Sequence, residues 1–581
     1  MTALVLPRPT APAAGGLRLT GLDAVRALAL LLVLAFHVEP SVVPGGFVGV
    51  DVFFVVSGYL ITVLLLREHG ASGRIDLRGF FVRRARRLIP VAAVVVLVCS
   101  TLALLLGGDV LVGLPAALLG AATFSSNWVQ LLVSNDYFAR SGTGLFDNFW
   151  SMAIEEQFYL LWPVVLILLG GRVLSRSLRQ RLVLVVVLSA LAPLVLTAAG
   201  QSSWAYLSTF GHSFGLLLGA VTALLLGPDA STAASGRGAR IGWSGLAGLA
   251  ATGLVALALS PFAALPQARS LASITAGLLT LVMVLGLIRG VPAIAPRLDG
   301  SLVGWVGRRS YGIYLWHLPL LVLAQAALPG SGEQKVLVRL FAVGLAVALS
   351  ALCFRFVEAP VRVRGWRAVL RRPAGGSAIA ATAVGLALVS TLVTAGAPSE
   401  TSIGRLLGEA EAGSESASSV AGVDGAGEET VAIGDSVMLA SSAGLSEKFP
   451  GITLDAAVDR QLTVAAETIS EHVAEDPGLE TIVLGLGING VGGADDLRDA
   501  VEAAGGRDVV LVNVWGPVAW AESVNSDIAE VADEFDNVAV ADWRSRARAH
   551  PELLAKDGIH PGDAGGRLYA ASIEDALESL A

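Results

Sequence analysis

The chain has 581 residues, of which 54% are hydrophobic and only 15% are charged. Soluble globular proteins carry about 25% charged residues, so this composition excludes an ordinary soluble enzyme and indicates a membrane protein. The two cysteines, Cys99 and Cys353, both lie in apolar stretches, which excludes a disulfide framework and a cysteine-based zinc site.

The charges divide the chain into two parts. Residues 400–581 contain 34 acidic and 10 basic residues, a net charge of −24, whereas residues 1–399 carry a net charge of +16. An acidic C-terminal part offers no basic surface to nucleic acid, so we expect no nucleic-acid partner. The pattern predicts a basic, apolar membrane body followed by an acidic C-terminal domain.

The N-terminal segment 1–20 lacks the small-residue cleavage site of a signal peptide, and we interpret it as a cytoplasmic tail before a permanent span. Apolar runs long enough to cross a bilayer follow it. Twelve such runs lie near 24–43, 47–66, 88–107, 110–133, 149–170, 182–199, 210–228, 241–260, 270–289, 311–329, 336–356 and 376–397.

Arginine-rich loops set the expected orientation, because positive residues stay on the cytoplasmic side. Twelve full spans cannot place all of these loops on one side. The run 110–133 contains Pro115 and several polar residues, so we expect it to be re-entrant, which leaves eleven spans. The N-terminus is then cytoplasmic and the C-terminal domain lies outside the plasma membrane. The loops are 67–87, 172–181, 237–240, 289–309 and 355–372.

Composition gives the remaining boundaries. We expect a polytopic α-helical membrane domain over 21–372, a final transmembrane helix over 373–397, and a flexible linker over 398–429, which is rich in Ala, Gly, Ser and Glu. Over 430–581, strand-like runs alternate with helical stretches, which predicts a three-layer α/β/α domain. The strand-like runs are VAIG, ITLDAAV, TIVLGLG, VVLVNVWG and NVAVADW.

The stretch TVAIGDSVM (430–438) places Ser436 where the first strand ends, and reactive groups collect at the carboxyl ends of parallel strands. Taken alone, Asp435 and Ser436 are also ordinary helix N-caps. However, Asp557 and His560 can supply an orienting carboxylate and a base, and Asn489, at the end of another strand, can donate to an oxyanion. Three polar sites at strand ends favour nucleophilic catalysis by Ser436.

These motifs resemble the SGNH (GDSL-like) hydrolase superfamily. The resemblance implies that Ser436 attacks an acyl carbonyl, that His560 takes its proton, and that Asp557 fixes the imidazole. It implies an oxyanion hole built from the backbone N–H of Ser436, the side chain of Asn489 and a third residue. At that third position the family usually has glycine, whereas this chain has Asp459. The motifs are GDS (434–436), GIN (487–489) and DGIH (557–560).

Six segments of the membrane half, in order, resemble the acyltransferase-3 family of integral membrane proteins. The resemblance implies a cytoplasmic acyl-CoA donor, usually acetyl-CoA, no permanently bound cofactor, and a catalytic His37 with Arg26 as its partner. Before LLLGA (216–220) the family commonly has arginine, whereas this chain has His212. The segments are GLDAVR with a downstream histidine (21–37), GGFVGVDVFFVVSGYLIT (45–62), FFVRRARRLIP (80–90), NFWSMAIEEQFYLLWP (148–163), SYGIYLWHLP (310–319) and FRFVEAP (354–360).

Several polar residues of this half are candidates for the acyl-donor site, since ionisable groups inside a membrane are costly and usually functional. Arg26 and His37 are three helical turns apart, so both can face one interior groove. Simpler interpretations also exist: Arg26 and His37 as a pair that satisfy each other, and the arginines of 83–87 as cytoplasmic anchors. Likewise, one of Glu155 and Glu156 can be a solvated residue, and His317 can be a core histidine. The candidates are Arg26, Arg83, Arg84, Arg86, Arg87, Glu156, Tyr314 and His317.

The fused arrangement resembles the peptidoglycan O-acetyltransferases of Gram-positive bacteria. The resemblance implies transfer of acetyl from acetyl-CoA to Ser436 and on to the C6 hydroxyl of N-acetylmuramic acid in the cell wall, which protects the wall against lysozyme. The alternatives are another envelope polysaccharide as acceptor, a membrane-anchored SGNH esterase, and a transporter with a passive domain. No motif predicts a metal site. The supporting segments are VDRQ (458–461), VNVWGP with a downstream VN (512–525), VADWRS (540–545) and DGIHP (557–561).

Overall fold

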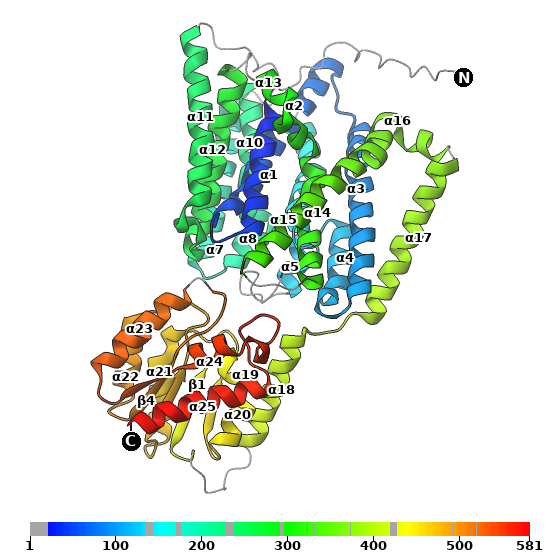
Figure 1. The fold of residues 1–581 in the computed structure, drawn as a ribbon. Helices are drawn as coiled ribbons and strands as arrows, with labels where there is room; N and C mark the ends of the chain where they lie inside the picture. The colour runs from blue at the N-terminus through cyan, green and yellow to red at the C-terminus, as the bar shows by residue number, and fades with distance from the viewer. Residues whose placement is uncertain are drawn as a thin grey trace. The chain divides into compact units, whose positions relative to one another are not determined.

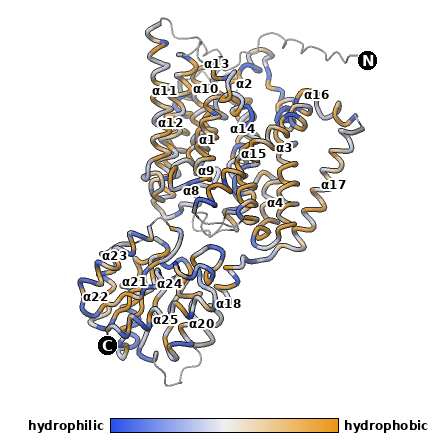
Figure 2. Tube along the Cα trace, viewed as in Figure 1, coloured by the Kyte–Doolittle hydropathy of each residue, from blue (hydrophilic) through white to orange (hydrophobic). Residues whose placement is uncertain are grey.

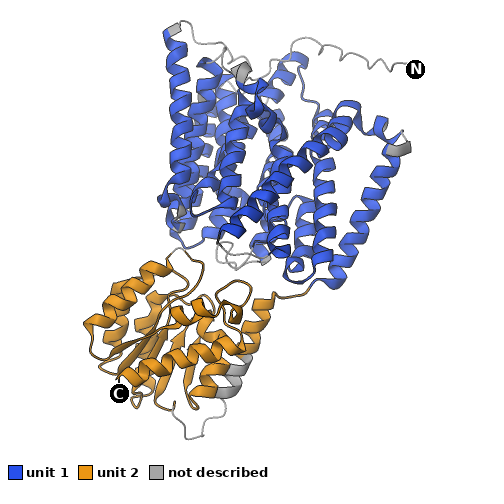
Figure 3. Ribbon diagram, in the orientation of Figure 1, with its two compact units in different colours: residues 1–397 blue, residues 398–581 orange. Residues whose placement is uncertain are grey.

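The protein is seen here in a computed structural model, in which the chain divides into two compact units, Met1–Ala397 (unit 1) and Pro398–Ala581 (unit 2) (Figure 3). The predicted tail, 1–20, lies outside the described residues. The structure describes residues 21–133, 143–169, 176–227, 237–290, 295–328, 332–371, 373–418, 427–490, 492–518 and 520–580.

Unit 1 is built of helices whose residues are mostly hydrophobic (Figures 1 and 2). In the described part of the chain, eight helices are long and apolar enough to cross a membrane, and each falls on a predicted run. The chain is therefore a multi-pass membrane protein. The eight are α2 (Gly49–Ser72), α3 (Leu77–Leu106), α6 (Phe149–Leu169), α7 (Arg176–Ala198), α11 (Arg237–Leu259), α12 (Arg269–Gly290), α15 (Gly332–Cys353) and α17 (Pro373–Gly396).

Three other predicted spans coincide with helices that are shorter or more polar, so the count of eleven spans stays a prediction. They are α1 (Leu22–Val38), α10 (Phe214–Leu226) and α14 (Leu302–Ala327). Short elements connect the long helices: η1 (Gly46–Val48), η2 (Gly108–Leu111), α8 (Ser202–Leu207), α9 (Thr209–His212), η4 (Pro261–Ala264), η5 (Pro266–Ala268), α13 (Ala295–Gly300), η6 (Phe354–Glu358) and α16 (Ala359–Leu370).

The run 110–133 contains two short helices, α4 (Leu114–Thr123) and α5 (Ser126–Val133). The chain breaks between them at Phe124, whose φ of 53° lies in the left-handed region. At 1.5 Å per residue the helices are roughly 15 and 12 Å long, so neither crosses a hydrocarbon core of about 30 Å. The buried Asn127 side chain donates to a backbone carbonyl at 3.1 Å. Irregular backbone that is packed within protein in this way is what a re-entrant segment requires.

Glycines let α2 and α10 approach backbone to backbone. A Cβ atom at Gly58 would collide with the carbonyl of Leu216, and one at Gly219 would collide with the carbonyl of Val55. Small residues at helix contacts are typical of packing in membranes. The close approach brings the start of α2 beside the segment that precedes α10.

Unit 2 has the predicted three-layer architecture. Its five strands are all parallel, in the order β2-β1-β3-β4-β5. Helices α21, α22 and α23 cover one face and α20 and α25 cover the other (Figure 1). Both faces of the sheet are therefore buried, which explains the nearly continuous apolar runs of its strands. The strands are β1 (Thr430–Gly434), β2 (Thr453–Ala456), β3 (Thr481–Gly485), β4 (Asp508–Val512) and β5 (Val538–Ala541).

The helices of unit 2 follow the strands in alternation, so the carboxyl ends of all five strands meet at one edge. The helices that follow the strands are α19 (Ser436–Ala440), α20 (Ser442–Lys448), η7 (Leu462–Val464), α21 (Ala465–Glu475), α22 (Ala494–Ala503), α23 (Ala521–Glu534), α24 (Trp543–Ala549), η8 (Pro551–Leu553) and α25 (Asp563–Leu580).

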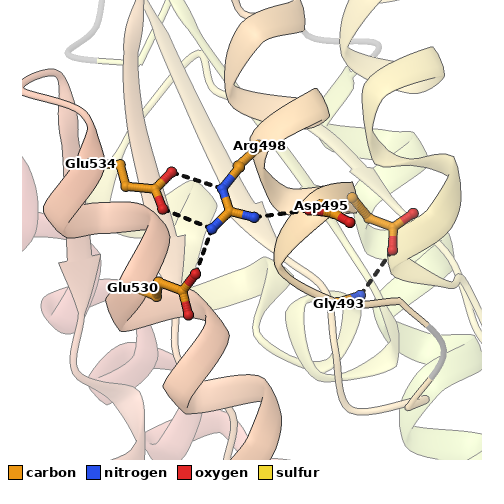
Figure 4. Close-up of polar contacts among 6 residues, drawn as sticks. Gly493, Asp495, Arg498, Glu530 and Glu534 are labelled. Atoms are coloured by element: carbon orange, nitrogen blue, oxygen red, sulfur yellow. Dashed lines mark hydrogen bonds and ion pairs between the residues drawn. The ribbon is translucent and has the colours of Figure 1, made fainter.

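An exposed ion cluster ties α22 to α23 on the outer layer (Figure 4). The guanidinium of Arg498 donates to both carboxylate oxygens of Glu534 at 2.7 Å, to Glu530 at 2.5 Å and to Asp495 at 2.9 Å. Exposed pairs of this kind contribute little to stability individually, because water and salt screen them. The cluster therefore orients the two helices relative to each other.

The prediction of a flexible linker over 398–429 is wrong for its first half. Residues Ser402–Ser418 form a helix, α18, which belongs to unit 2 and packs against α19 and α20. The Ser442 hydroxyl donates to the Ala410 carbonyl of this helix at 3.4 Å. The interpretation gave weight to Gly and Ser, but the run RLLGEAEA consists largely of strong helix formers that tertiary contact then stabilises. Residues 419–426 lie outside the described part.

Candidate functional site

Three predicted residues of unit 2 lie in one hydrogen-bonded row. The distance from Ser436 Oγ to His560 Nε2 is 2.8 Å, and that from His560 Nδ1 to Asp557 Oδ2 is 2.5 Å. Ser436 begins α19 directly after β1, and Asp557 and His560 lie in the segment before α25. Since Asp557 accepts from Nδ1–H, the Nε2 lone pair faces the serine hydroxyl, which is the arrangement of a nucleophile and its general base.

Asp557 is held as an anion by its hydrogen bonds. Burial alone would raise its pKa, but donation from His560 Nδ1 and from the backbone N–H of Ile559, 2.9 Å from Oδ1, outweighs burial and lowers the pKa below the ordinary value. The carboxylate therefore stays charged in more acidic conditions than an ordinary aspartate, and it keeps His560 in one tautomer and one orientation.

Asp435, beside the nucleophile, has the opposite behaviour. Its Oδ1 accepts from the Val437 N–H at 2.9 Å, so it caps α19 as the simpler interpretation predicts. Burial raises its pKa from 3.8 to about 6, because hydrogen bonds from backbone N–H groups only partly offset the loss of water. Asp435 therefore shapes the turn that presents Ser436.

The candidate oxyanion donors surround the same edge. Ser436 is the first residue of α19, so its backbone N–H has no intrahelical carbonyl partner. The Asn489 amide donates one of its two hydrogens to the Arg460 carbonyl at 2.9 Å, which positions the amide and leaves the second hydrogen to a ligand. Asp459 adopts φ of 62°, the left-handed conformation that the usual glycine takes readily. The substitution of Asp for Gly therefore preserves the backbone turn.

A polar network braces the loop that carries Asp459. Arg460 Nη2 donates to Asp455 Oδ1 at 2.6 Å, and His472 Nε2 lies 2.9 Å from the other carboxylate oxygen. Burial opposes ionisation of Asp455, but these hydrogen bonds outweigh it, so the pKa of Asp455 is lowered. The network explains why an L-residue keeps the left-handed conformation, which aspartate tolerates better than most residues.

In unit 1, a cavity of about 110 Å³ collects several predicted donor-site residues. Arg84 Nη2 donates to Glu156 at 3.0 Å, and its guanidinium lies 3.2 Å from the centre of the Tyr159 ring. The Tyr159 hydroxyl in turn donates to Glu155. Four of the predicted residues line the cavity: Arg26, Arg84, Arg87 and Tyr314. The other polar residues of its lining, which were not predicted, include Ser151, Glu155, Tyr159, Ser310 and Tyr311.

Four of the predicted donor-site residues, which are Arg83, Arg86, Glu156 and His317, do not line this cavity. Arg83 is exposed and pairs with Glu68 at 3.0 Å, as the simpler interpretation of a cytoplasmic anchor predicts. Arg86 lies against Gly365 of α16. Glu156 pairs with Arg84, which does line the cavity. Within the arginine cluster, helical periodicity therefore separates inward from outward side chains.

Arg26 lines the cavity and His37 is not among its lining residues, so one groove shared by both stays a prediction. Eleven residues on a helix place them roughly 16 Å apart along its axis, which exceeds the reach of a cavity this small. The His37 ring instead packs edge-on against His317, with centroids 5.0 Å apart. His317 Nδ1 donates to the Tyr314 carbonyl at 2.5 Å, and Tyr314 lines the cavity. The row of rings thus links His37 to the cavity.

Comparison with known protein families identifies the family of the membrane half. The model of the acyltransferase-3 family, described as an acyltransferase domain, matches residues 19–355. The chain belongs to this family. The cavity, Arg26 and His37 all lie within the matched residues, and the protein is a multi-pass membrane acyltransferase.

Curated relatives match both units of this acyltransferase. The putative peptidoglycan O-acetyltransferase YrhL of Bacillus subtilis is 28% identical, over 96% of this chain and 98% of that protein. The peptidoglycan O-acetyltransferase OatA of Listeria monocytogenes is 29% identical, over 96% and 97%. The solved C-terminal catalytic domain of Streptococcus pneumoniae OatA, with a methylsulfonyl adduct, is 28% identical and covers 27% of this chain and 96% of that one, with a TM-score of 0.25.

His212, at the position where the acyltransferase-3 family commonly has arginine, forms a buried pair with Asp51. His212 Nε2 lies 3.0 Å from Asp51 Oδ1, and Nδ1 donates to the Tyr206 carbonyl at 2.8 Å. Because a carbonyl can only accept, the bond at Nε2 requires a second proton, either on His212 or on Asp51. The histidine therefore occupies the place of the family's arginine and binds a carboxylate there.

Asp51 and Tyr159 were not predicted as functional candidates, and Glu156 was chosen over its neighbour Glu155. Asp51 was hidden in an apolar run, and only its partner His212 could have identified it. Glu155 and Tyr159 are four residues apart, so they share one helical face, and this spacing could have separated Glu155 from its neighbour Glu156.

Proposed function

We propose that this acyltransferase carries an acetyl group from cytoplasmic acetyl-CoA across the membrane to Ser436, and from there to the C6 hydroxyl of N-acetylmuramic acid in peptidoglycan. The observation that carries the proposal is the Ser436–His560–Asp557 row in a chain whose membrane half is an acyltransferase. Relatives that match both units and bear the name peptidoglycan O-acetyltransferase support the acceptor.

The cavity in unit 1 is the proposed acyl-donor site. Arg26, Arg84 and Arg87 line it, and guanidinium groups bind phosphates through charge-assisted, bidentate hydrogen bonds. Arg84 is already paired with Glu156, so Arg26 and Arg87 carry the charge available to the phosphates of acetyl-CoA. The positive-inside rule supports a cytoplasmic N-terminus and an extracellular unit 2.

Helix α1 carries one candidate group towards each side of the membrane. Arg26 lies in its N-terminal half, in the donor cavity, and His37 lies in its last turn. We assign His37 to the passage of the acetyl group outward, after it leaves the thioester, because His37 is linked to the cavity through His317 and Tyr314.

At Ser436 the reaction has two balanced steps. The serine Oγ attacks the acetyl carbonyl as its proton passes to His560 Nε2, and the leaving group departs with that proton. The sugar hydroxyl then loses its proton to His560 and attacks the acetyl-serine, which regenerates the serine hydroxyl. We assign stabilisation of the oxyanion in both steps to the N–H groups of Ser436, Asp459 and Asn489.

The test separates a transferase from an esterase. Full-length protein in detergent receives p-nitrophenyl acetate with an N-acetylglucosamine pentamer or a muroglycan, and mass spectrometry follows acetylated sugar and free acetate. The proposal predicts acetylated sugar, lost in Ser436→Ala and retained in Ser442→Ala, a buried serine outside the row. Free acetate alone, with every acceptor, would overturn transfer in favour of hydrolysis.

A further inference from the structure

Exposed apolar surface in unit 2 is concentrated at the edge that carries Ser436. Among the described residues of this unit, the exposed large hydrophobic side chains are Val458, Val464 and Trp520, with 50%, 38% and 40% of their surface accessible. Val458 and Val464 follow β2, and Trp520 follows β4. Because the strands are parallel, all three lie on the same edge as the nucleophile.

The Trp520 indole is held in place although it is exposed. Its Nε1–H donates to the carbonyl of Ile488 at 3.0 Å. The ring also lies directly against Gly490, where an added Cβ would collide with three indole atoms. A large ring that is fixed before a ligand arrives loses little conformational entropy on binding, which is the usual property of an aromatic anchor.

The same peptide segment connects this ring to the nucleophile. The backbone N–H of Ile488 donates to Asp435, which precedes Ser436, while the carbonyl of Ile488 accepts from Trp520. Asn489, the candidate oxyanion donor, is the next residue in the chain. A group that rests on the exposed face of Trp520 is therefore beside the acyl-serine.

We propose that Trp520 is the binding platform for a pyranose ring of the acceptor glycan, next to the sugar whose hydroxyl accepts the acetyl group. This inference rests on the proposed function. One face of a pyranose presents C–H groups, which complement the electron-rich face of an indole ring. The platform supplies what transfer needs and hydrolysis does not, because a sugar hydroxyl must be positioned to react before water does.

Binding is tested first, without turnover. In full-length Ser436→Ala protein in detergent, calorimetry measures the Kd of the N-acetylglucosamine pentamer. Adding Trp520→Ala or Trp520→Leu raises the Kd at least about tenfold, whereas Trp520→Phe, which keeps a flat ring, stays within about threefold. Trp204→Ala, which removes an exposed tryptophan of unit 1, is the matched control and leaves the Kd unchanged.

Turnover with p-nitrophenyl acetate then locates the effect. Trp520→Ala lowers the ratio of acetylated sugar to acetate about tenfold and leaves the rate of acetyl-serine formation unchanged. An unchanged Kd in Trp520→Ala and Trp520→Leu overturns the platform. Equal losses in Trp520→Ala and Trp520→Phe also overturn it, because they assign the effect to the hydrogen bond on Ile488. Failure of the proposed function is distinct: no acetyl-serine forms, while the Kd still depends on the ring.

Discussion

Each unit of this acyltransferase contains a buried histidine beside a carboxylate. The two histidines differ in the partner of the ring nitrogen that does not face the carboxylate. In unit 2, His560 joins Asp557 at 2.5 Å and a serine hydroxyl at 2.8 Å. In unit 1, His212 joins Asp51 at 3.0 Å and a backbone carbonyl at 2.8 Å. A hydroxyl can transfer its proton to the histidine, whereas a carbonyl can only accept a hydrogen bond from it.

The comparison teaches that a histidine–carboxylate pair is defined by its third partner. His560 can exchange a proton with Ser436, so its geometry suits the role of base that we propose. His212 is held by a carboxylate on one side and a backbone carbonyl on the other, so it ties α9 to α2. The pairs are built from different distances in sequence: Asp557 and His560 are three residues apart, whereas Asp51 and His212 are 161 apart.

The largest effect distinguishes the two histidines. His560→Ala lowers acetyl transfer from p-nitrophenyl acetate by roughly 10³-fold or more, because the nucleophile loses its base. His212→Gln leaves this reaction within about twofold of wild type, since the ester bypasses the membrane half. Product quantification by mass spectrometry checks both. An equal loss in the two variants would contradict the assignment of separate roles.

A second pair of variants tests the donor cavity. Arg87→Gln should raise the KM for acetyl-CoA, the donor that we propose, by about 10- to 100-fold, because it removes a charge from the proposed phosphate site. Arg83→Gln, on the same helix but exposed and paired with Glu68, changes the KM by less than about twofold. Steady-state kinetics with reconstituted protein measures both constants. Equal effects would indicate general cytoplasmic charge rather than this cavity.

The raised pKa of Asp435, which lies beside Ser436, predicts how the stability of unit 2 changes with pH. The pKa of Asp435 is raised from 3.8 to about 6 in the folded state, so the folded state binds its proton more tightly than the unfolded chain does. Rising pH therefore removes stability between about 3.8 and 6, and the loss is constant above that range.

Asp435→Asn should accordingly increase the free energy of unfolding of unit 2 at pH 7–8 by roughly 1–3 kcal/mol, with the gain vanishing below about pH 4. The asparagine side-chain oxygen can still accept from Val437, so the cap survives. Hydrogen exchange of the β1 and β3 amides in the full chain, followed against pH, provides the measurement. A difference independent of pH would contradict the burial argument.

The smallest effect concerns the left-handed residue. Asp459→Gly keeps kcat for transfer within about twofold, because glycine adopts φ of 62° without strain. Asp459→Val lowers kcat about tenfold, since a β-branched residue resists this conformation and pulls the N–H out of position. Steady-state kinetics compares the two variants. A tolerated valine would show that the turn is unimportant.

Much of this architecture could be predicted from sequence because its signals are local. Apolar runs identified the long helices, and alternating strands and helices identified the sheet with Ser436 at its edge. The triad was also accessible, because each member follows an element that the sequence predicts. The helix α18 was missed, because Gly and Ser within it hid a run of helix formers stabilised by contact with unit 2.

What sequence could not predict was which residues meet across the membrane bundle. Helical periodicity groups Arg83, Arg84, Arg86 and Arg87 by face, but only the packing shows that the face with Arg84 and Arg87 lines the cavity. The contact of Asp51 with His212 depends on the glycine-mediated approach of α2 and α10, which no short motif encodes.

The most direct test of the account is detection of an acetyl group on Ser436 during turnover. Full-length protein in proteoliposomes receives isotope-labelled acetyl-CoA, and rapid acid quench followed by peptide mass spectrometry examines the segment that contains Ser436. We predict labelled acetyl on Ser436 that disappears when the glycan is added and appears on the sugar. Labelled glycan without any acetyl-serine, or undiminished transfer by Ser436→Ala, would contradict the relay.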